Sequence, residues 1–268
     1  MNHLLRESAP VSERAWQQVD EEARRQLTTC LGARKLVDFS GPFGWEHSAS
    51  GFLSLDGIER QEGARLSAHS RRVLPLVELR SNFEVAREEL TRTDRGASDP
   101  DLSDLGRAAR ALARAENAAV FHGWEAAGIV GIATMSPHDP IGLGDEPAQM
   151  PRQVARAVEA LRSGGVEGPY GLALGPEQYT SVVETTEHGG ILVFDHLRHI
   201  LGGRIVWAPG VSGAVALSQR GGDFVLESGQ DVSIGYESHD SGTVRLYLEE
   251  SFTFRVHSPE AGIALPKS

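Results

Sequence analysis

The clearest hydrophobic pattern along the chain is a strict alternation near the C-terminus. Between Thr243 and Val256, apolar residues occupy every second position, and one carboxylate, Glu250, stands among them. This period of two predicts a long strand with one buried and one solvated face. Most strands have about 5–6 residues, so a strand of this length suits a thin, extended subunit. A carboxylate on the apolar face is costly without compensation, so we expect Glu250 to be paired or to lie at a bulge or an edge.

Two other stretches have the period of helices. After Ser12, apolar residues recur every three or four positions, which predicts a helix with Ser12 as its N-cap and Gly32 as its C-cap. A second helix is predicted from Asp101 or Ser103, either of which can cap it, to about Trp124. Each of these helices has one apolar face and needs a surface to pack on.

The segment 47–80 has no helical pattern and is interpreted as a long β-hairpin. We expect a turn at Asp56-Gly57 and a polar tip from Arg60 to Gly63. Pro75 places part of the hairpin at a sheet edge or a bulge. Such a hairpin has little core of its own, so it requires a neighbouring surface. The first ten residues form an arm that must dock as well.

From residue 151 the pattern changes to alternating short helices and strands, which predicts a compact unit inserted into the rest of the chain. The fold class is therefore α+β, with the outer segments forming one discontinuous unit around the inserted one. Five segments are predicted. They are the N-terminal arm and helix with the start of the outer unit (1–46), the hairpin (47–80), the outer unit with the long helix (81–132), the inserted unit (133–218) and the C-terminal sheet of the outer unit (219–268).

Composition limits the classes of function. The chain has 268 residues, and 26 basic against 37 acidic side chains give a formal charge of −11. This balance disfavours a role that depends on neutralising phosphates, so no nucleic acid is expected as a partner. The single cysteine, Cys30, excludes an internal disulfide and suits a reducing cytoplasm. No apolar run has the length of a signal peptide or a membrane span, so we expect a cytoplasmic location and no membrane partner.

A search for catalytic motifs finds no nucleophile elbow, P-loop, dinucleotide fingerprint, HExxH or CxxC. His196 and His199 have a spacing that zinc sites use. A further ligand at a recognisable spacing is missing, so we interpret them as solvated or capped histidines and expect no metal. A row of arginines on the second helix favours pairing with acidic residues over contact with a polyanion: Arg107, Arg110 and Arg114.

Several short motifs, in order along nearly the whole chain, together resemble one known family. They are GARKLVD at 32–38, GPFGWE at 41–46, LPLVELR at 74–80, DLSDL at 101–105, GVEGPY at 165–170, RGGDF at 220–224, GQDVSIGY at 229–236 and RLYLEESFTFRV at 245–256. The ordered set resembles the encapsulins, which are bacterial nanocompartment shell proteins with the tailed-phage major capsid fold. The resemblance implies that 47–80 is the E-loop, that the long helix is the spine helix of a P-domain and that the inserted unit is an A-domain.

The resemblance also implies a function. It predicts a self-assembling shell protein rather than an enzyme, and a homo-oligomeric icosahedral shell of about 60 copies, since closed symmetry repeats the same contacts. The shell would hold a cargo enzyme through the cargo's terminal targeting peptide. Ferritin-like proteins and dye-decolorising peroxidases are such cargoes and would connect the shell with iron storage or oxidative stress. A prophage capsid protein that packages DNA, and a hydrolase or bacteriocin, are the alternatives.

Two sites follow from the resemblance by position. Cargo docking is expected where the N-terminal helix meets the C-terminal sheet, although plain core packing is an equally good reading for any single residue: Leu27, Leu31, Leu36, Asp38, Phe39, Phe224 and Asp231. A five-fold pore is expected at the tip of the inserted unit, where a ring of carboxylates would favour cations, the alternative being a solvated loop: Glu184, Thr185, Thr186, Glu187, His188, Gly189 and Gly190. Glu88 stands where flavin-binding members carry an aromatic residue, so we expect no cofactor.

Overall fold

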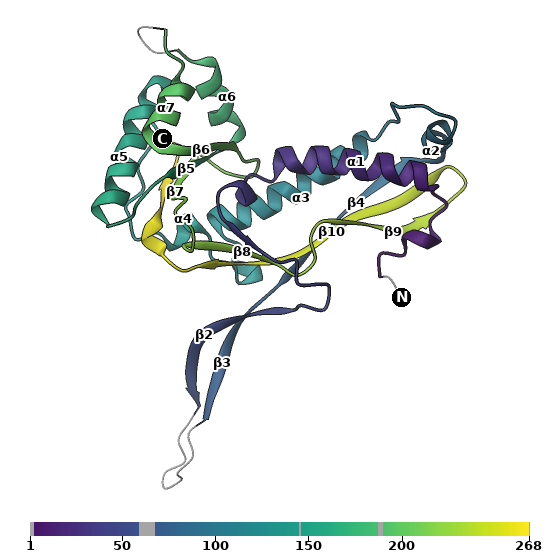
Figure 1. Cartoon of the computed structure of the whole chain (residues 1–268), viewed down its shortest axis with the longest axis horizontal. Coiled ribbons are helices and arrows are strands. Elements are labelled where there is room, and N and C mark those ends of the chain that lie inside the picture. Colours follow the sequence, from purple (N-terminus) through teal and green to yellow (C-terminus); the bar gives the residue numbers. More distant parts are fainter. Residues whose placement is uncertain (1–2, 59–67, 145, 187–189, 268) are drawn as a thin grey trace.

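The computed structural model describes residues 3–58, 68–144, 146–186 and 190–267. Its strands form two larger sheets in two adjoining lobes, and a separate two-stranded hairpin projects away from both (Figure 1). The architecture contains both helices and strands, and the predicted α+β class is confirmed. None of the helices in the described ranges is long and apolar enough to cross a membrane.

The first sheet is built around the strand that the alternation predicts. Strand β10 has the bounds expected from the sequence, and it pairs antiparallel with β4 along one side and with β9 and then β8 along the other. Strand β1 extends the sheet by pairing parallel with β8. The strands are β1 (Asp38–Ser40), β4 (Val77–Ala86), β8 (Phe224–Ser228), β9 (Ser233–His239) and β10 (Thr243–Val256).

Two long helices lie side by side along this sheet, α1 (Glu13–Cys30) and α3 (Ser103–His122) (Figure 1). The predicted N-cap of α1 is confirmed, because the Ser12 hydroxyl oxygen accepts the Ala15 N–H at 3.1 Å. The apolar stripes of both helices pack with β4 and β10 in one buried cluster. A short helix, α2 (Arg87–Asp94), follows β4 directly and occupies a stretch without a clear pattern in the sequence.

The predicted role of Gly32 as a C-cap is wrong. Helix α1 ends at Cys30, and the backbone of Gly32 is right-handed, with φ −70°, rather than left-handed. A Cβ atom at this position would lie 2.9 Å from the Cβ of Ala208 and 2.9 Å from the carbonyl oxygen of Trp207. Glycine is needed here because the chain passes close to a residue of the other lobe.

The prediction that one face of β10 is solvated is also wrong for the middle of the strand. Tyr247, Glu249 and Thr253 are as buried as the apolar residues that alternate with them. The N-terminal arm covers part of this face: Tyr236 donates its backbone N–H to the Leu4 carbonyl at 2.8 Å, and His3 lies 3.5 Å from Glu249. The arm therefore docks on its own subunit.

The hairpin consists of β2 (Ala49–Ile58) and β3 (Ala68–Pro75) and extends away from the lobes (Figure 1). The predicted turn at Asp56-Gly57 is wrong, because these residues pair with Ser70 and His69 inside the ladder. The pairing holds their backbone extended. The predicted tip at 60–63 lies outside the described residues.

The second sheet belongs to the other lobe and has the strand order β11-β7-β5-β6. Strands β5 and β7 are buried along their whole length. Strand β11 comes from the C-terminal segment, so residues 219–268 contribute to both sheets and not only to the first. The strands are β5 (Tyr170–Leu174), β6 (Gly202–Trp207), β7 (Ala214–Ser218) and β11 (Gly262–Leu265).

Helices of the second lobe flank its sheet, and short 3-10 turns join the elements of both lobes (Figure 1). The α-helices are α4 (Ile132–Met135), α5 (Met150–Ser163), α6 (Pro176–Glu184) and α7 (Val193–Leu201). The 3-10 turns are η1 (Arg6–Ser8), η2 (Ala33–Lys35), η3 (Glu125–Ala127), η4 (Pro147–Gln149) and η5 (Pro259–Ala261).

Candidate functional sites

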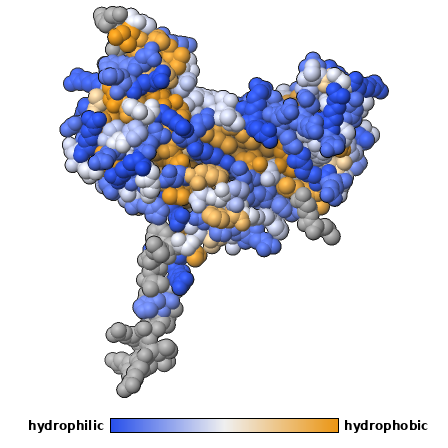
Figure 2. Space-filling model, in the orientation of Figure 1, coloured by the Kyte–Doolittle hydropathy of each residue, from blue (hydrophilic) through white to orange (hydrophobic). Residues whose placement is uncertain are grey.

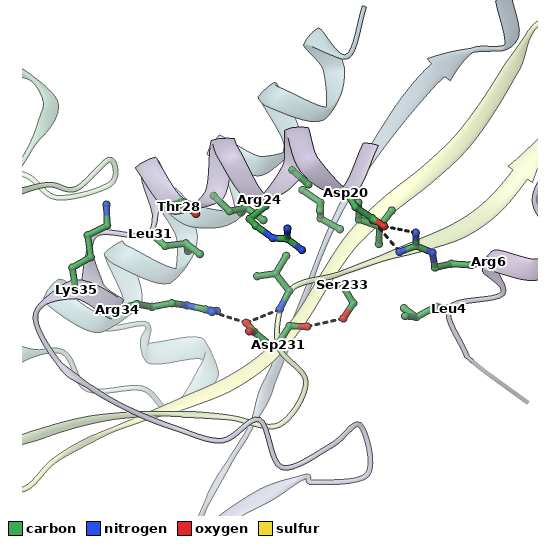
Figure 3. A pocket seen from close by; sticks show the side chains of 15 residues that line it. Leu4, Arg6, Asp20, Arg24, Thr28, Leu31, Arg34, Lys35, Asp231 and Ser233 are labelled. Carbon is green, nitrogen blue, oxygen red and sulfur yellow. Dashed lines mark hydrogen bonds and ion pairs between the residues drawn. The ribbon is translucent and has the colours of Figure 1, made fainter. Parts of the chain in front are cut away.

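A groove of about 610 Å³ lies between α1 and the start of β9 (Figure 3). Ala23, Leu27 and Leu31 line it from the helix, and Ile234 and Leu248 line it from the sheet. On the face shown in Figure 2, apolar side chains gather in a band below α1, over this region. The groove thus offers apolar surface to a segment laid along the helix.

The rim of the groove is polar and held by ion pairs. Arg6 donates to both carboxylate oxygens of Asp20, at 3.0 and 2.7 Å. Arg34 donates to Asp231 at 2.5 Å, and the same Asp231 oxygen accepts the Val232 N–H at 2.8 Å (Figure 3). Charge-assisted bonds of this kind fix side-chain positions, so the rim is preorganised.

Arg34 is the centre of a larger buried cluster, which we call the Arg34 cluster (Arg34, Glu116, Asp231 and Glu250). Its guanidinium donates to Glu116 at 2.7 Å and to Glu250 at 2.6 Å, and both carboxyl groups are fully buried. The expectation that Glu250 is paired is confirmed. Burial alone would lower the pKa of Arg34, but the charges of Glu116 and Glu250 more than reverse this effect and raise it.

The residues predicted for docking separate into two groups. Leu27, Leu31 and Asp231 line the groove. A second cavity of about 550 Å³ is lined by three more of them, Leu36, Asp38 and Phe224. Arg34 and Lys35 line both cavities.

The seventh predicted residue, Phe39, is 38% exposed, and the Arg34 guanidinium lies 5.1 Å from the centre of its ring. Leu31 and Phe224 are buried in the core, with 8% and 2% exposure. Sequence reasoning missed Arg34 and Glu116; the only signal was Glu250, the one charge on the apolar side of β10.

The tip of the second lobe is described only in part. Helix α6 ends at Glu184, Thr186 pairs with Leu192 in an isolated bridge, and Glu187, His188 and Gly189 lie outside the described residues. Gly190 has φ +82°, a conformation that glycine adopts without strain.

Apolar side chains flank the polar segment predicted for the pore. Val183, Ile191 and Leu192 are 44%, 59% and 39% exposed. The surroundings of the predicted rim are therefore less polar than the stretch from Glu184 to Gly190 alone indicates.

Other candidate chemistry is sparse. Within the described ranges no three or more His, Cys, Asp or Glu side chains are grouped so that they could hold a metal ion. Arg107 of the spine helix pairs with Asp104 of the same helix at 3.0 Å. Glu88 is exposed on α2.

A sheet organised by one very long strand, a long helix along it, a projecting hairpin and an α+β lobe together define a capsid-like fold. Two solved structures share the fold. The virus-like particle from Pyrococcus furiosus has a TM-score of 0.64 at 18% identity and covers 93% of this chain and 98% of its own. The capsid of the Myoviridae phage XM1 has a TM-score of 0.55 at 13% identity and covers 88% and 91%.

The sequence comparisons identify the family. A family model described as "Encapsulating protein for peroxidase" matches residues 1–253. A type 1 encapsulin shell protein from Rhodospirillum rubrum is 46% identical over 99% of this chain and 96% of its own length. Those from Mycobacterium tuberculosis and Brevibacterium linens are 40% and 41% identical, each over 99% of both chains. The chain belongs to the encapsulin family; it is a self-assembling shell protein and not an enzyme.

Proposed function

We propose that this shell encloses an enzyme, and that a short peptide at the cargo's terminus docks in the groove between α1 and β9. The observation that carries the proposal is the groove itself, which combines an apolar floor with a rim of fixed charges. An extended peptide with small and aliphatic residues fits such a surface, because aliphatic side chains gain from burial while the rim fixes the peptide's orientation. The family description supports a peroxidase as one class of cargo; a ferritin-like protein is the other class that we propose.

The test blocks the groove without disturbing the core. Leu31 is a poor position for it, because Leu31 is buried in the core and a charge there would unfold the subunit. Thr28 is exposed and lines the groove, so Thr28→Trp fills the space with a large side chain. Thr29 is exposed on the same helix and does not line the groove, and its hydroxyl donates to the Arg25 carbonyl, so Thr29→Trp is the matched control.

Each variant is coexpressed with a fluorescent reporter that carries the C-terminal segment of a dye-decolorising peroxidase, or of a ferritin-like protein, from the same bacterium. Thr28→Trp shells should assemble, but the reporter fluorescence that copurifies with them should be at least tenfold lower than with wild-type shells. Thr29→Trp shells should retain the wild-type fluorescence. Equal loading of both variants would contradict docking in this groove. Loss in both would indicate a general defect of the shell.

We further propose a closed shell of about 60 subunits, the simplest icosahedral assembly of one repeated contact set, working in the bacterial cytoplasm. We also propose that segment 184–190 surrounds a five-fold pore. The carboxylates Glu184 and Glu187 support this role, because they would form charged rings around such an axis. The alternative of a DNA-filled capsid remains testable by nuclease treatment of purified particles, and the formal charge of −11 argues against it.

A further inference from the structure

The Arg34 cluster brings three carboxyl groups to a single guanidinium. Glu116 comes from α3, Glu250 from β10 and Asp231 from the loop before β9, and all three accept hydrogen bonds from Arg34 at 2.5–2.7 Å. Glu116 and Glu250 are 0% exposed, whereas Asp231 is 48% exposed. Three ionised carboxylates would leave two negative charges uncompensated, and two of the three groups have no contact with water.

The unpaired oxygens point to how this excess charge is avoided. Oε1 of Glu116 and Oε1 of Glu250 find no hydrogen-bond donor in the described part of the chain. The two carboxyl groups are close neighbours, because Nη2 of Arg34 lies 2.7 Å from Oε2 of Glu116 and 2.6 Å from Oε2 of Glu250. A proton held by this pair would remove one buried charge. Carboxylic acids that share a site behave in this way, because two like charges cannot both ionise at short distance.

We propose that Glu116 and Glu250 share one proton, and that loss of this proton at alkaline pH weakens the Arg34–Asp231 bond and loosens the rim of the groove. After deprotonation, Arg34 is the one cation that the described residues pair with these two buried charges. Asp231 is the partner that Arg34 gives up most readily, because its half-exposed carboxylate can be solvated by water instead. The groove would then lose the fixed charge on its sheet side. A consequence for cargo release depends on the docking role proposed above. The presence of the shared proton does not depend on that role.

The surroundings of Glu250 agree with a held proton. Burial raises its pKa, the Glu116 charge raises it further, Arg34 lowers it, Asp231 raises it, and the net result is a pKa well above the ordinary value. From the adjoining strand β4, Leu79 pairs with Glu250 and brings no charge. The folded state holds this proton more tightly than the unfolded chain does. The proton's contribution to the free energy of unfolding is therefore fully present below the ordinary glutamate pKa, and it is lost as the pH rises through the raised pKa of the folded state.

The first experiment detects the proton directly by infrared spectroscopy of intact, cargo-free shells. The wild type should show the carbonyl stretch of a protonated carboxylic acid at neutral pH, and this band should vanish on titration to alkaline pH. Glu250→Gln should remove the band. Glu227→Gln is the control, because Glu227 is also buried in the first sheet, while its hydrogen bonds from His47 and Ser50 outweigh burial and lower its pKa.

If Glu250→Gln does not fold, Glu116→Gln serves instead, since it also leaves a single carboxylate beside Arg34. The wild-type titration needs no variant at all. Shells without an alkali-sensitive acid band, or a band that persists when either glutamate is replaced, would overturn the shared proton.

The second experiment observes the groove without cargo. An environment-sensitive fluorophore is attached at Thr28→Cys, where the native Cys30 is buried and does not compete. Its emission should shift at the pH at which the infrared band vanishes, and Glu250→Gln should abolish the shift. An equal shift with and without Glu250→Gln would show that the groove responds to another group. Because no cargo is used, failure of peptide docking cannot produce either result.

Discussion

The hairpin and the sheet of the second lobe are both built from β-strands, but they differ in what buries them. Strands β5 and β7 are buried at every position, with helices of the same lobe packed against them. In the described part of β3, the side chains from His69 to Val73 are all exposed. An isolated two-stranded hairpin is at best marginally stable in water. The second lobe shares a buried core with the rest of its own subunit, whereas we propose that the hairpin depends on a surface from another subunit.

The comparison separates two requirements of a shell protein, folding and assembly. Residues of the inserted sheet decide whether a subunit exists at all. We expect residues of the hairpin to decide whether subunits remain together, and we expect that they can change without loss of the fold. Mutations in the two regions should therefore fail in different ways.

The largest effect is expected in the second sheet. Leu172 is 0% exposed on β5, so Leu172→Asp buries an unpaired charge at a cost of several kcal/mol against a total stability of about 5–15 kcal/mol. We expect insoluble protein, measured as the yield of soluble subunit. Ser70→Asp on the exposed side of β3 should yield normal amounts. Soluble, folded Leu172→Asp protein would show that this sheet does not limit folding.

Next in size is removal of the outer hairpin, residues 54–68. This deletion should abolish shells while leaving subunits folded, because both main sheets remain complete. Sedimentation velocity reports assembly, and circular dichroism of the small species reports folding. Intact particles from the deleted chain would contradict the assignment of the hairpin as an intersubunit element.

A smaller effect is expected at the base of the hairpin. Val73 is 55% exposed and lines an apolar cavity of about 330 Å³ together with Val130 and Met135. If a neighbouring subunit covers it, Val73→Glu removes roughly 1.5–3 kcal/mol of apolar burial and raises the concentration needed for assembly by about tenfold or more. Light scattering over a dilution series measures this threshold. Val73→Ile keeps an apolar side chain at this position and is the control, and a threshold equal in both variants would place Val73 outside the interface.

The smallest effect concerns the tip of the second lobe. Glu187→Lys would turn a ring of negative charges into positive ones around a five-fold axis, which should slow ferrous iron and speed an anionic dye on their way to an encapsulated reporter by several-fold. The matched control is Glu159→Lys, the same charge change at an exposed position on α5. Unchanged influx for both probes, with shells intact, would mean that the pore lies elsewhere.

The sequence predicts best where the cause of the structure is local. The bounds of β10 follow from its alternation, and the start of α1 follows from Ser12, because period and cap act within a few residues. The prediction of a turn at Asp56-Gly57 was wrong because this pair can also be extended when it is paired with an opposite strand, as it is here with Ser70 and His69. The prediction for Gly32 was wrong because glycine is needed there for close contact with Ala208, which is far away in the sequence.

The sites show the same limit. Leu27 lies on the apolar stripe of α1 and Leu31 directly follows the helix, and both could be found by counting positions. The rest of the groove depends on which distant segments meet: Arg34 touches Glu116, Asp231 and Glu250, residues from three separate parts of the sequence. Only an unexplained charge on an apolar face indicated that such a partner had to exist.

Strand β11 has a consequence for the order in which the chain matures. It forms one end of the second sheet by pairing with β7, although β8, β9 and β10 are all synthesised between them. A ribosome must therefore translate the whole first sheet before the second can close. A chain interrupted before Gly262 exposes the unpaired edge of β7, and an open strand edge is a surface for aggregation. Incomplete translation products would be withheld from shells that need every position filled by an intact subunit.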